Sequence, residues 1–368
     1  MEICSWLCML GASVYIFTVL RTPKDGCGYW HAALGALVGA FLYFLGYPGL
    51  CGGVALGCSL TLLHGSERRR ELLPVQNRVV LITGCDSGFG HALAKQLSDM
   101  GVKVFAGVLD VHGAGAQQLR ARGCANLEVL QLDVTDGSQI AAAHQCIRAQ
   151  VRDAGLWGLV NNAGILHTVA DAELHPLLLY RRIMEVNFLG AVNMCQVFLP
   201  LLKRSRGRII NVSSVAGEVP MPLLAAYGAS KAALSSFSKA LRLELSAWGV
   251  RVAVIQPGGF KTNIYGNSDD ILTGISSETR EDYGEEYILS LVSNMLKMSQ
   301  QLSEDLSPVV DDMCHALLAV RPRPLYTPGP MAWLLPFLQC YCPTAVFDSI
   351  IMRILKNDNC EPAGLSRR

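Results

Sequence analysis

Charged residues are scarce in this sequence. Asp, Glu, Lys and Arg make up 17% of its 368 residues, against about 25% in an average soluble chain, and 51% are apolar. The net charge of +1 and the lack of a basic patch with interleaved aromatics give no reason to expect a nucleic-acid partner. The thirteen cysteines contain no C-x-x-C pair and no zinc-ligand spacing. We therefore expect no metal, and thiols that are buried or face lipid in a reducing compartment.

Charge is missing most clearly from the first seventy residues. Two runs, 3–20 and 29–47, carry no full charge, and a bilayer span needs about 20 apolar residues. A third apolar run, 50–63, is shorter and is expected to span, to re-enter or to pack against the others. A cleaved signal peptide is the alternative for the first run, but Glu2 is the sole charged residue before it, so the basic start of a signal peptide is missing. We expect retained membrane anchors.

Basic residues suggest how these anchors are oriented. Arg21 and Lys24 follow the first run, and three arginines at 68–70 follow the third. Lys and Arg prefer the cytoplasmic side, and three spans would place both clusters there with the N-terminus in the lumen. Two spans would leave the first cluster in the lumen. We expect three spans in the endoplasmic reticulum membrane, with the rest of the chain facing the cytosol.

Strand-like and helix-like segments alternate from residue 77 onward. This alternation predicts an α/β fold with a doubly wound parallel sheet, joined by right-handed crossovers. The expected strands are residues 79–83, 103–108, 127–133, 159–161, 207–212 and 251–256.

A glycine-rich loop follows the first expected strand. Thr-Gly-Cys-Asp-Ser-Gly-Phe-Gly over 83–90 leads into an amphipathic segment, 91–100. Gly84 allows a tight turn, Gly88 a close approach of the backbone to a pyrophosphate, and Gly90 close packing of the helix. With Ser87 in the same loop, the helix N-terminus is expected to bind the phosphates of a dinucleotide.

The charge after the second expected strand indicates which dinucleotide is used. Asp110 stands there, where a carboxylate accepts a hydrogen bond from the ribose 2′-hydroxyl of NAD and repels the 2′-phosphate of NADP. The alternative is a solvated residue at the end of a strand. Because the glycine loop contains no Arg or Lys, we expect NAD.

Tyr227 and Lys231 are four residues apart and therefore share one face of a helix. A nearby ammonium favours the phenolate, so this pair can move a proton to or from an alcohol. Ser214 lies thirteen positions upstream, at the end of a strand-like run. Tyr-x-x-x-Lys alone occurs by chance on many helices. A catalytic role for this pair is favoured because Ser214 and the glycine-rich loop occur in the same chain.

Together these motifs resemble the short-chain dehydrogenase/reductase family, over about residues 76–265. The resemblance rests on the glycine loop, Asn-Asn-Ala-Gly at 161–164, Asn187, Ser214, Tyr227 with Lys231, and Pro-Gly-Gly at 257–259, in the family's order. It implies that Asn187, Ser214, Tyr227 and Lys231 are catalytic, with Asn187 holding a water of the proton relay. It also implies that the cofactor contacts Tyr227, Lys231, Asp133, Asn161, Gly164, Pro257, Gly258 and Thr262.

Within the family the chain is most similar to hydroxysteroid dehydrogenases that oxidise 17β-hydroxyl groups. This implies a small steroid substrate, such as estradiol or testosterone. Retinol or an 11β-hydroxysteroid is the alternative, and a scaffold without catalysis is the alternative of another class. The residues expected to line an apolar substrate wall, or simply to pack in a core, are Tyr283, Tyr287, Leu291, Met295 and Met298.

The sequence thus predicts a membrane anchor over 1–70, an NAD-binding catalytic domain over 71–306, an apolar extension over 307–356 and a loose tail over 357–368. Prolines at 328, 330, 336 and 343 oppose a straight membrane span in the extension. We expect the extension to dip into the membrane at a substrate entrance, or to form the contact of a homodimer.

Overall fold

The computed structural model describes residues 11–15, 38–39, 50, 53–59, 71–265, 275–300, 302–355 and 360–366. The chain divides into two compact units, Met1–Leu73 with Leu318–Arg323, and Pro74–Leu317 with Pro324–Arg368. In the first unit, the described parts of the three apolar runs are helical. The rest of these runs lies outside the described residues. An antiparallel bridge pairs Leu72 with Ala319 in the same unit.

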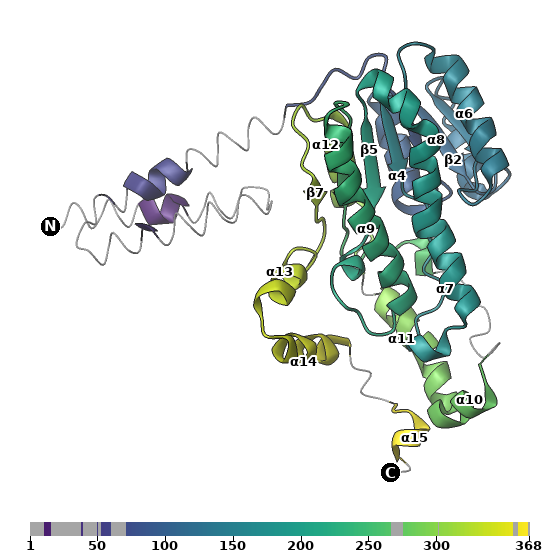
Figure 1. Cartoon of the computed structure of the whole chain (residues 1–368), viewed down its shortest axis with the longest axis vertical. Coiled ribbons are helices and arrows are strands. Elements are labelled where there is room, and N and C mark those ends of the chain that lie inside the picture. Colours follow the sequence, from purple (N-terminus) through teal and green to yellow (C-terminus); the bar gives the residue numbers. More distant parts are fainter. Residues whose placement is uncertain are drawn as a thin grey trace. The chain divides into compact units, whose positions relative to one another are not determined.

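A seven-stranded parallel sheet forms the centre of the second unit, in the order β3-β2-β1-β4-β5-β6-β7 (Figure 1). Since β1 has β2 on one side and β4 on the other, the chain switches its direction of winding there, which confirms the predicted doubly wound sheet. The strands are β1 (Val79–Ile82), β2 (Lys103–Val108), β3 (Leu127–Gln131), β4 (Gly158–Asn161), β5 (Arg208–Val212), β6 (Arg251–Ile255) and β7 (Leu325–Tyr326).

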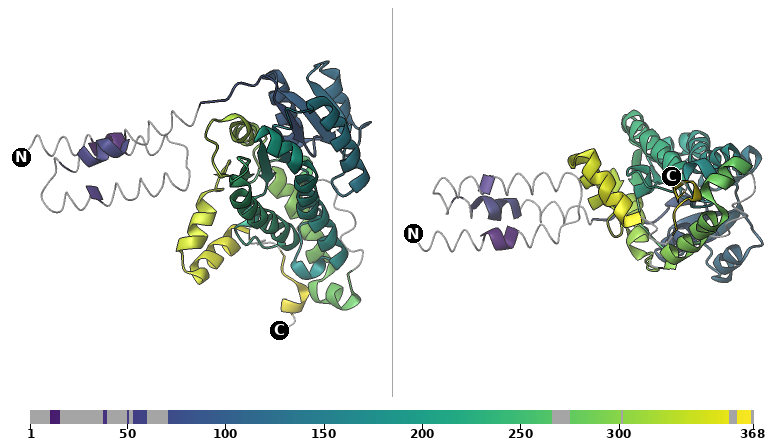
Figure 2. Two further views of the ribbon diagram at one scale, coloured as in Figure 1. Left: turned by 45° about the horizontal axis from the view of Figure 1, so that its top comes forward. Right: turned by 90° about the horizontal axis from the view of Figure 1, so that it is seen from below.

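Helices cover the sheet on both faces (Figures 1 and 2). The α-helices within and after the sheet are α4 (Gly88–Asp99), α5 (Ala114–Ala121), α6 (Gly137–Val151), α7 (Leu177–Met184), α8 (Gly190–Ser205), α9 (Ala225–Ser246), α10 (Ser277–Tyr283), α11 (Glu285–Gln300), α12 (Ser307–Leu318), α13 (Leu334–Tyr341), α14 (Thr344–Leu355) and α15 (Ala363–Ser366).

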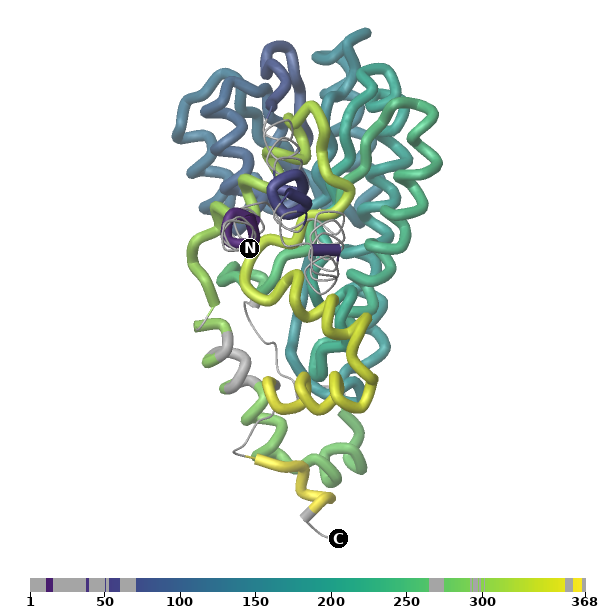
Figure 3. Tube along the Cα trace, turned by 90° about the vertical axis from the view of Figure 1, so that its left-hand side faces the viewer, coloured from purple at the N-terminus to yellow at the C-terminus, as the bar shows by residue number. Residues whose placement is uncertain are grey.

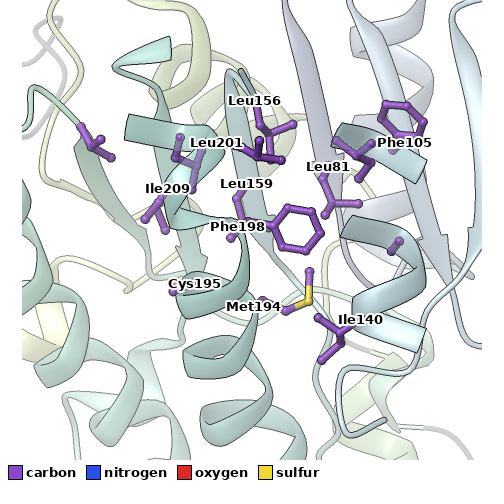
Figure 4. Packing of buried hydrophobic residues seen from close by; sticks show 14 of the residues in the cluster. Leu81, Phe105, Ile140, Leu156, Leu159, Met194, Cys195, Phe198, Leu201 and Ile209 are labelled. Carbon is purple, nitrogen blue, oxygen red and sulfur yellow. The ribbon is translucent and has the colours of Figure 1, made fainter. Parts of the chain in front are cut away.

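The main core lies between one face of the sheet and helices α6, α8 and α9. Phe198 of α8 lies among Leu159, Leu81 and Ile140 in this cluster (Figure 4). Because side chains alternate along a strand, Gly158 faces the opposite side, where Leu317 of α12 contacts it. A rigid sheet buried on both faces fixes where each strand ends.

Helices α7 and α8 are joined by a π-helical turn, η2 (Glu185–Leu189), so that 177–205 is one interrupted helix. In the part of the chain that the structure describes, this is the one helix long and apolar enough to cross a bilayer. Of its most apolar window, 44% is buried, and Phe198, Leu201 and Leu202 pack in the main core. It is therefore a core helix of the second unit.

The C-terminal part is more ordered than the sequence indicated. Strand β7 extends the sheet beside β6, and α13 and α14 pack on Val215 and Val219 through Leu335, Phe347 and Ile351. In the described part of the tail, where a loose segment was expected, α15 packs against α10 (Figure 3). The reason is local: Gly284 and Gly364 permit the two helices to approach closely.

Candidate active site

Tyr227 and Lys231 lie on the first turns of α9, on one face of the helix. The Lys231 Nζ lies 5.7 Å from the centre of the Tyr227 ring, and it donates a hydrogen bond to the Val212 carbonyl oxygen at 2.9 Å. Lys231 is 3% exposed. Burial disfavours its ammonium form and lowers the pKa of Lys231 to about 8. A desolvated cation next to a phenol ring is the electrostatic arrangement that stabilises a phenolate.

Asn187 reaches the same place from the π-helical turn η2. Its Oδ1 accepts from the Ile165 N–H at 2.8 Å, and its Nδ2 donates to the Ile165 oxygen at 2.8 Å and to Ser230 Oγ at 3.0 Å. Ser230 Oγ in turn donates to the Tyr227 carbonyl oxygen at 2.7 Å. The wide turn therefore fixes Asn187 between the loop after β4 and helix α9.

Gly164 sits where Lys231 and Asn187 converge. A Cβ added to Gly164 would lie 3.2 Å from Lys231 Nζ and 3.4 Å from Asn187 Oδ1. The lack of a side chain leaves room for both buried polar groups beside the loop after β4. Asn187, Gly164 and Lys231 are distant in sequence, and the fold brings them together.

Ser214 follows β5 and begins the short 3-10 helix η3 (Val215–Gly217). Its Oγ accepts from the Ala216 N–H at 3.2 Å. This turn packs directly on α9, since a Cβ on Gly217 would lie 2.7 Å from the Lys231 carbonyl carbon. The hydroxyl is thus held on a turn that is fixed against the helix of Tyr227 and Lys231.

The glycine loop adopts the shape that its glycines predict. Gly84 and Gly88 have φ of 69° and 59°, a left-handed conformation that side chains rarely adopt. A Cβ on Gly90 would lie 2.5 Å from both the Gly84 oxygen and Asn162 Nδ2. Ser87 is the N-cap residue of α4 and has extended backbone. The loop thus brings backbone N–H groups to the N-terminus of α4, where an anion binds.

Two residues that the sequence did not single out brace this loop. Thr83 Oγ1 accepts from the N–H groups of Asn162 and Ala163, each at 3.0 Å. Asn162 Nδ2 donates to the oxygens of Thr83 and Gly84 at 2.9 and 3.0 Å. A Thr before the first glycine and a second Asn in Asn-Asn-Ala-Gly were the available signals. These bonds join the loop after β1 to the loop after β4.

Asp110 is exposed in the turn after β2, and its Oδ1 accepts from the His112 N–H at 2.8 Å. Asp86 of the glycine loop supports this turn, since its carboxylate accepts from the N–H groups of Leu109 and Asp110 at 3.0 to 3.2 Å. Asp86 was not predicted to belong to the site. A carboxylate within a loop expected to bind phosphate was the signal that could have identified it. Two acidic side chains therefore lie at this turn.

The other expected cofactor residues differ in where they point. Asp133 follows β3 and accepts from the Thr135 hydroxyl at 2.7 Å. Asn161 is 4% exposed and turns its side chain into the sheet, where Nδ2 donates to Asn211 Oδ1 at 2.8 Å and lies 3.3 Å from Cys195 Sγ. Its side chain thus stabilises β4 and β5, and any contact that it makes with a dinucleotide is through the backbone.

The segment after β6 closes the site on the glycine-loop side. The Pro257 oxygen accepts from the Val215 N–H at 3.0 Å, and the Gly258 N–H donates to the Pro328 oxygen at 3.0 Å. A Cβ on Gly88 would lie 3.4 Å from Thr262 Cγ2. Thr262 is therefore next to the phosphate-binding turn.

The expected substrate wall is partly polar. Tyr287 donates to Asp171 at 2.8 Å and Tyr283 to Glu173 at 3.2 Å, while Leu291 is buried. Burial raises the pKa of Tyr283 to about 12, with the nearby carboxylates adding to the effect. The side chains of Met295 and Met298 lie outside the described residues. Tyr283, Tyr287 and Leu291 nevertheless pack in one hydrophobic cluster, so the described part of the expected wall combines apolar contacts with two phenol hydroxyls bonded to carboxylates.

The glycine loop, Asp110, Asp133, Gly164, Ser214 and Pro257 all follow the carboxyl ends of strands, which are β1 to β6 in that order. In an open α/β sheet this edge is where ligands bind, and the glycine loop and the Tyr–Lys pair meet there. A family model described as short chain dehydrogenase matches residues 78–271, more than half of the chain. The chain belongs to the short-chain dehydrogenase/reductase family. Members of this family are oxidoreductases, as expected from the motifs.

Relatives of this short-chain dehydrogenase differ in the substrates that their names give. Estradiol 17-beta-dehydrogenase 2 of Mus musculus is 43% identical, over 95% of this chain and 94% of that one. 11-beta-hydroxysteroid dehydrogenase type 2 of Oryctolagus cuniculus is 48% identical, over 75% and 70%. Retinol dehydrogenase 16 of Homo sapiens is 42% identical, over 79% and 92%. The first covers nearly all of both chains.

Among solved structures, a short-chain dehydrogenase from Burkholderia cenocepacia J2315 in complex with NADP matches with a TM-score of 0.57 and 25% identity. It covers 77% of this chain and 100% of that one. This likeness supports a dinucleotide site of the family's kind in this dehydrogenase, for NAD or NADP.

Proposed function

We propose that this short-chain dehydrogenase oxidises 17β-hydroxysteroids with NAD, converting estradiol to estrone and testosterone to androstenedione. The observation that carries the chemistry is the buried Lys231 ammonium beside the Tyr227 ring, with Asn187 fixed next to both. The observation that favours the substrate is the likeness to the mouse estradiol enzyme over 95% of the chain.

The residues fit a dinucleotide. Gly90 lets Gly84 and Asn162 pack closely against the start of α4, and the loop so held presents the N-terminus of this twelve-residue helix to the phosphates. The NAD contacts that we propose are made by Gly84, Ser87, Gly88, Gly90, Asp110, Asp133, Asn161, Gly164, Pro257, Gly258, Thr262, Tyr227 and Lys231. NAD held there would supply the acceptor for the hydride that leaves the carbon bearing the substrate hydroxyl.

The chain's own residues manage the proton. Ser214 holds the substrate oxygen by a hydrogen bond, and the Tyr227 phenolate takes the hydroxyl proton as the carbonyl forms. Lys231 favours the phenolate by its charge and binds the cofactor ribose. Asn187 keeps the loop after β4 in place and holds the water that returns the proton to solvent.

Charge favours NAD over NADP. Asp110 accepts a hydrogen bond from a ribose 2′-hydroxyl but repels a 2′-phosphate, and Asp86 adds a second negative charge at the same turn. A phosphate of about −2 charge at this turn would face two carboxylates.

An apolar surface around Tyr227 suits a steroid. Leu166, Val169, Leu223, Leu224 and Ile264 form one cluster with the Tyr227 ring. Such a surface separates apolar alcohols weakly, since one methylene is worth about 1–3 kcal/mol. Retinol and 11β-hydroxysteroids are therefore the competing substrates, as the names of the other relatives suggest.

We further propose the membrane arrangement. Residues 1–70 anchor the protein in the endoplasmic reticulum with three spans, and the catalytic domain faces the cytosol. A steroid partitions into the same membrane, which shortens its path to the site. The support is the two long uncharged runs and the basic clusters that follow the first and third runs.

A substrate panel tests the proposal. Microsomes that contain the full chain are assayed for kcat/KM with estradiol, testosterone, cortisol and all-trans-retinol, each with NAD and with NADP. We expect the two 17β-hydroxysteroids with NAD to give the highest values. A clear preference for cortisol or retinol would reject the 17β assignment and leave the Tyr227 mechanism standing.

A further inference from the structure

Ser230 lies about one helical turn after Tyr227 on α9 and is fully buried. Its Oγ donates to the Tyr227 carbonyl oxygen at 2.7 Å and accepts from Asn187 Nδ2 at 3.0 Å. Asn187 is also buried, and it is bonded to both the N–H and the oxygen of Ile165. One hydroxyl thus connects the turn η2, which is bonded to the loop after β4, with the helix that carries Tyr227.

The direction of these bonds determines which end of the Asn187 amide faces Ser230. A carbonyl oxygen can only accept, so the single proton of the Ser230 hydroxyl lies in its bond to Tyr227. Toward Asn187 the hydroxyl can therefore only accept, and it must meet the NH2 group. Ile165 imposes the same orientation, since its N–H donates to Oδ1 and its oxygen accepts from Nδ2. Ser230 and Ile165 thus hold the amide in one of its two orientations.

This orientation brings the amide oxygen of Asn187 to the same small space as Lys231. A Cβ added to Gly164 would lie 3.4 Å from Asn187 Oδ1 and 3.2 Å from Lys231 Nζ. An amide oxygen has two acceptor positions, and the Ile165 N–H takes one of them. Both N–H groups of Nδ2 are used, by Ile165 and by Ser230. Within the described residues, this leaves the second acceptor position of Oδ1 for a water molecule of the relay.

A second serine on α9 makes the same pair of bonds away from the site. Ser238 Oγ donates to the Leu234 carbonyl oxygen at 2.6 Å and accepts from Asn211 Nδ2 at 2.7 Å, and Ser238 is buried as well. Asn211 lies within strand β5, and Ser238 lies about two helical turns beyond Lys231. The two serines therefore match in burial and bonding and differ in the place of the asparagine that they hold.

We propose that Ser230 is a positioning residue of the proton relay, which keeps the Asn187 amide oxygen facing the space beside Lys231. The inference rests on the proposed function, in which Asn187 holds a water that returns the substrate proton to solvent. Without the Ser230 hydroxyl, one N–H of Asn187 is buried without an acceptor, and Ile165 alone opposes rotation of the amide. The cofactor and the alcohol are bound by other residues, so the loss falls on the transfer of the proton.

Ser230→Ala and Ser238→Ala in the membrane-bound full chain test this role. With NAD and the alcohol of the substrate panel that gives the highest kcat/KM, kcat and both KM values are measured, and kcat is measured again in D2O. We expect Ser230→Ala to lower kcat about tenfold, the usual cost of one lost buried hydrogen bond, and to change each KM by less than about twofold. The solvent isotope effect on kcat should increase, because the slowed step transfers exchangeable protons. Ser238→Ala should lower the Tm by a similar amount and keep the wild-type kcat and isotope effect.

A double variant tests whether Ser230 acts through Asn187. If it does, Ser230→Ala should lower kcat little further when Asn187→Ala is already present, whereas independent effects would multiply. Ser230→Cys keeps nearly the same volume and has a weak acceptor, so its kcat should lie between those of the wild type and Ser230→Ala. This variant carries the test if Ser230→Ala does not fold.

Three results would show the inference to be wrong. They are a wild-type kcat and isotope effect in Ser230→Ala, an equal loss of kcat in Ser238→Ala, which would follow from lower stability alone, or effects of Ser230→Ala and Asn187→Ala that multiply. Because the alcohol is chosen from the panel, these results do not depend on the 17β assignment. A wild-type protein that oxidised none of the four alcohols would reject the proposed function, and this inference with it.

Discussion

At the scale of single residues, the main feature of the site is one buried positive charge, the Lys231 ammonium. The Lys231 ammonium has three donors, and in the described part of the chain the Val212 carbonyl takes one of them. Its positive charge acts on the Tyr227 ring, whose centre lies 5.7 Å from Nζ. Gly164 and Asn187 border the same nitrogen, so the cation is confined by its surroundings.

Tyr227→Phe tests the proton transfer directly. The ring and its packing with Leu166 and Val169 remain, while the hydroxyl that takes the proton is removed. We expect kcat to fall by about 10²–10⁴-fold, the usual contribution of general acid–base catalysis. The dissociation constant of NAD, measured by fluorescence titration, should change little. A variant with the wild-type rate would remove Tyr227 from the mechanism.

The burial of Lys231 should appear in the pH dependence of stability. Its pKa is about 8 in the folded protein and 10.5 for a fully solvated lysine, so between these values the unfolded chain binds more protons. The unfolding free energy from this group therefore rises from pH 8 to pH 10.5, by about 3 kcal/mol. Urea unfolding of the detergent-solubilised protein without NAD is the measurement.

Lys231→Met is the comparison for that curve, since its side chain has similar length and no charge. The variant should lack the rise above pH 8 and should be more stable than the wild type at pH 7. Parallel curves for the two proteins would show that Lys231 has an ordinary pKa.

Cofactor preference should depend on Asp110. Asp110→Ala removes the charge that meets a 2′-phosphate, and we expect the ratio of kcat/KM for NAD to that for NADP to fall about tenfold. The exposed Asp153, which lies after α6, supplies the control Asp153→Ala with an unchanged ratio. Equal use of both cofactors by the wild type would contradict the charge argument.

At the scale of elements, turns and loops hold the site rather than the strands themselves. The wide turn η2 fixes Asn187, η3 fixes Ser214, and the glycine loop fixes the start of α4. Both η2 and the glycine loop are bonded to the segment after β4, and η3 is bonded to Pro257 after β6.

Gly90→Ala should disturb two loops at once. The new Cβ would lie 2.5 Å from both the Gly84 oxygen and Asn162 Nδ2, and relief of such overpacking usually costs about 1–3 kcal/mol. We expect a lower Tm and weaker NAD binding. Gly137→Ala, at the start of α6, is the matched control, because its Cβ would meet nothing within 4 Å. It should leave NAD binding unchanged and should not lower the Tm, since Ala at an unstrained helical Gly position is neutral or slightly stabilising.

The sequence predicted elements with a strong local pattern and missed those that depend on distant partners. Six strands were found because each is an apolar run, whereas β7 has two residues and exists because β6 offers a free edge. Asn161 was expected at the cofactor, but it lies on a strand and its side chain points to Asn211. Asp86 gains its role from residues that no local pattern connects to it.

At the scale of the whole molecule, an oxidoreductase of apolar alcohols gains from an attachment to the membrane. Apolar substrates concentrate in the bilayer, and the cofactor is supplied from the aqueous side. In the proposed layout, residues 1–70 keep the protein at the membrane where the substrate concentrates, and the glycine loop after β1 binds the cofactor from the aqueous side. The two tasks fall in different units of the chain.

The proposed orientation leads to a protease test. Three spans place Arg21, Lys24 and the arginines at 68–70 on the cytosolic side, so the catalytic domain should be exposed outside intact microsomes. We expect protease to digest that domain without detergent, while a lumenal marker protein is protected. Replacing the arginines at 68–70 with serines removes positive charge that favours the cytosolic side. In part of the protein molecules the catalytic domain should then lie in the lumen and be protected from protease. Protection of the wild-type domain until detergent is added would reverse the topology, and NAD would then have to be drawn from the lumen.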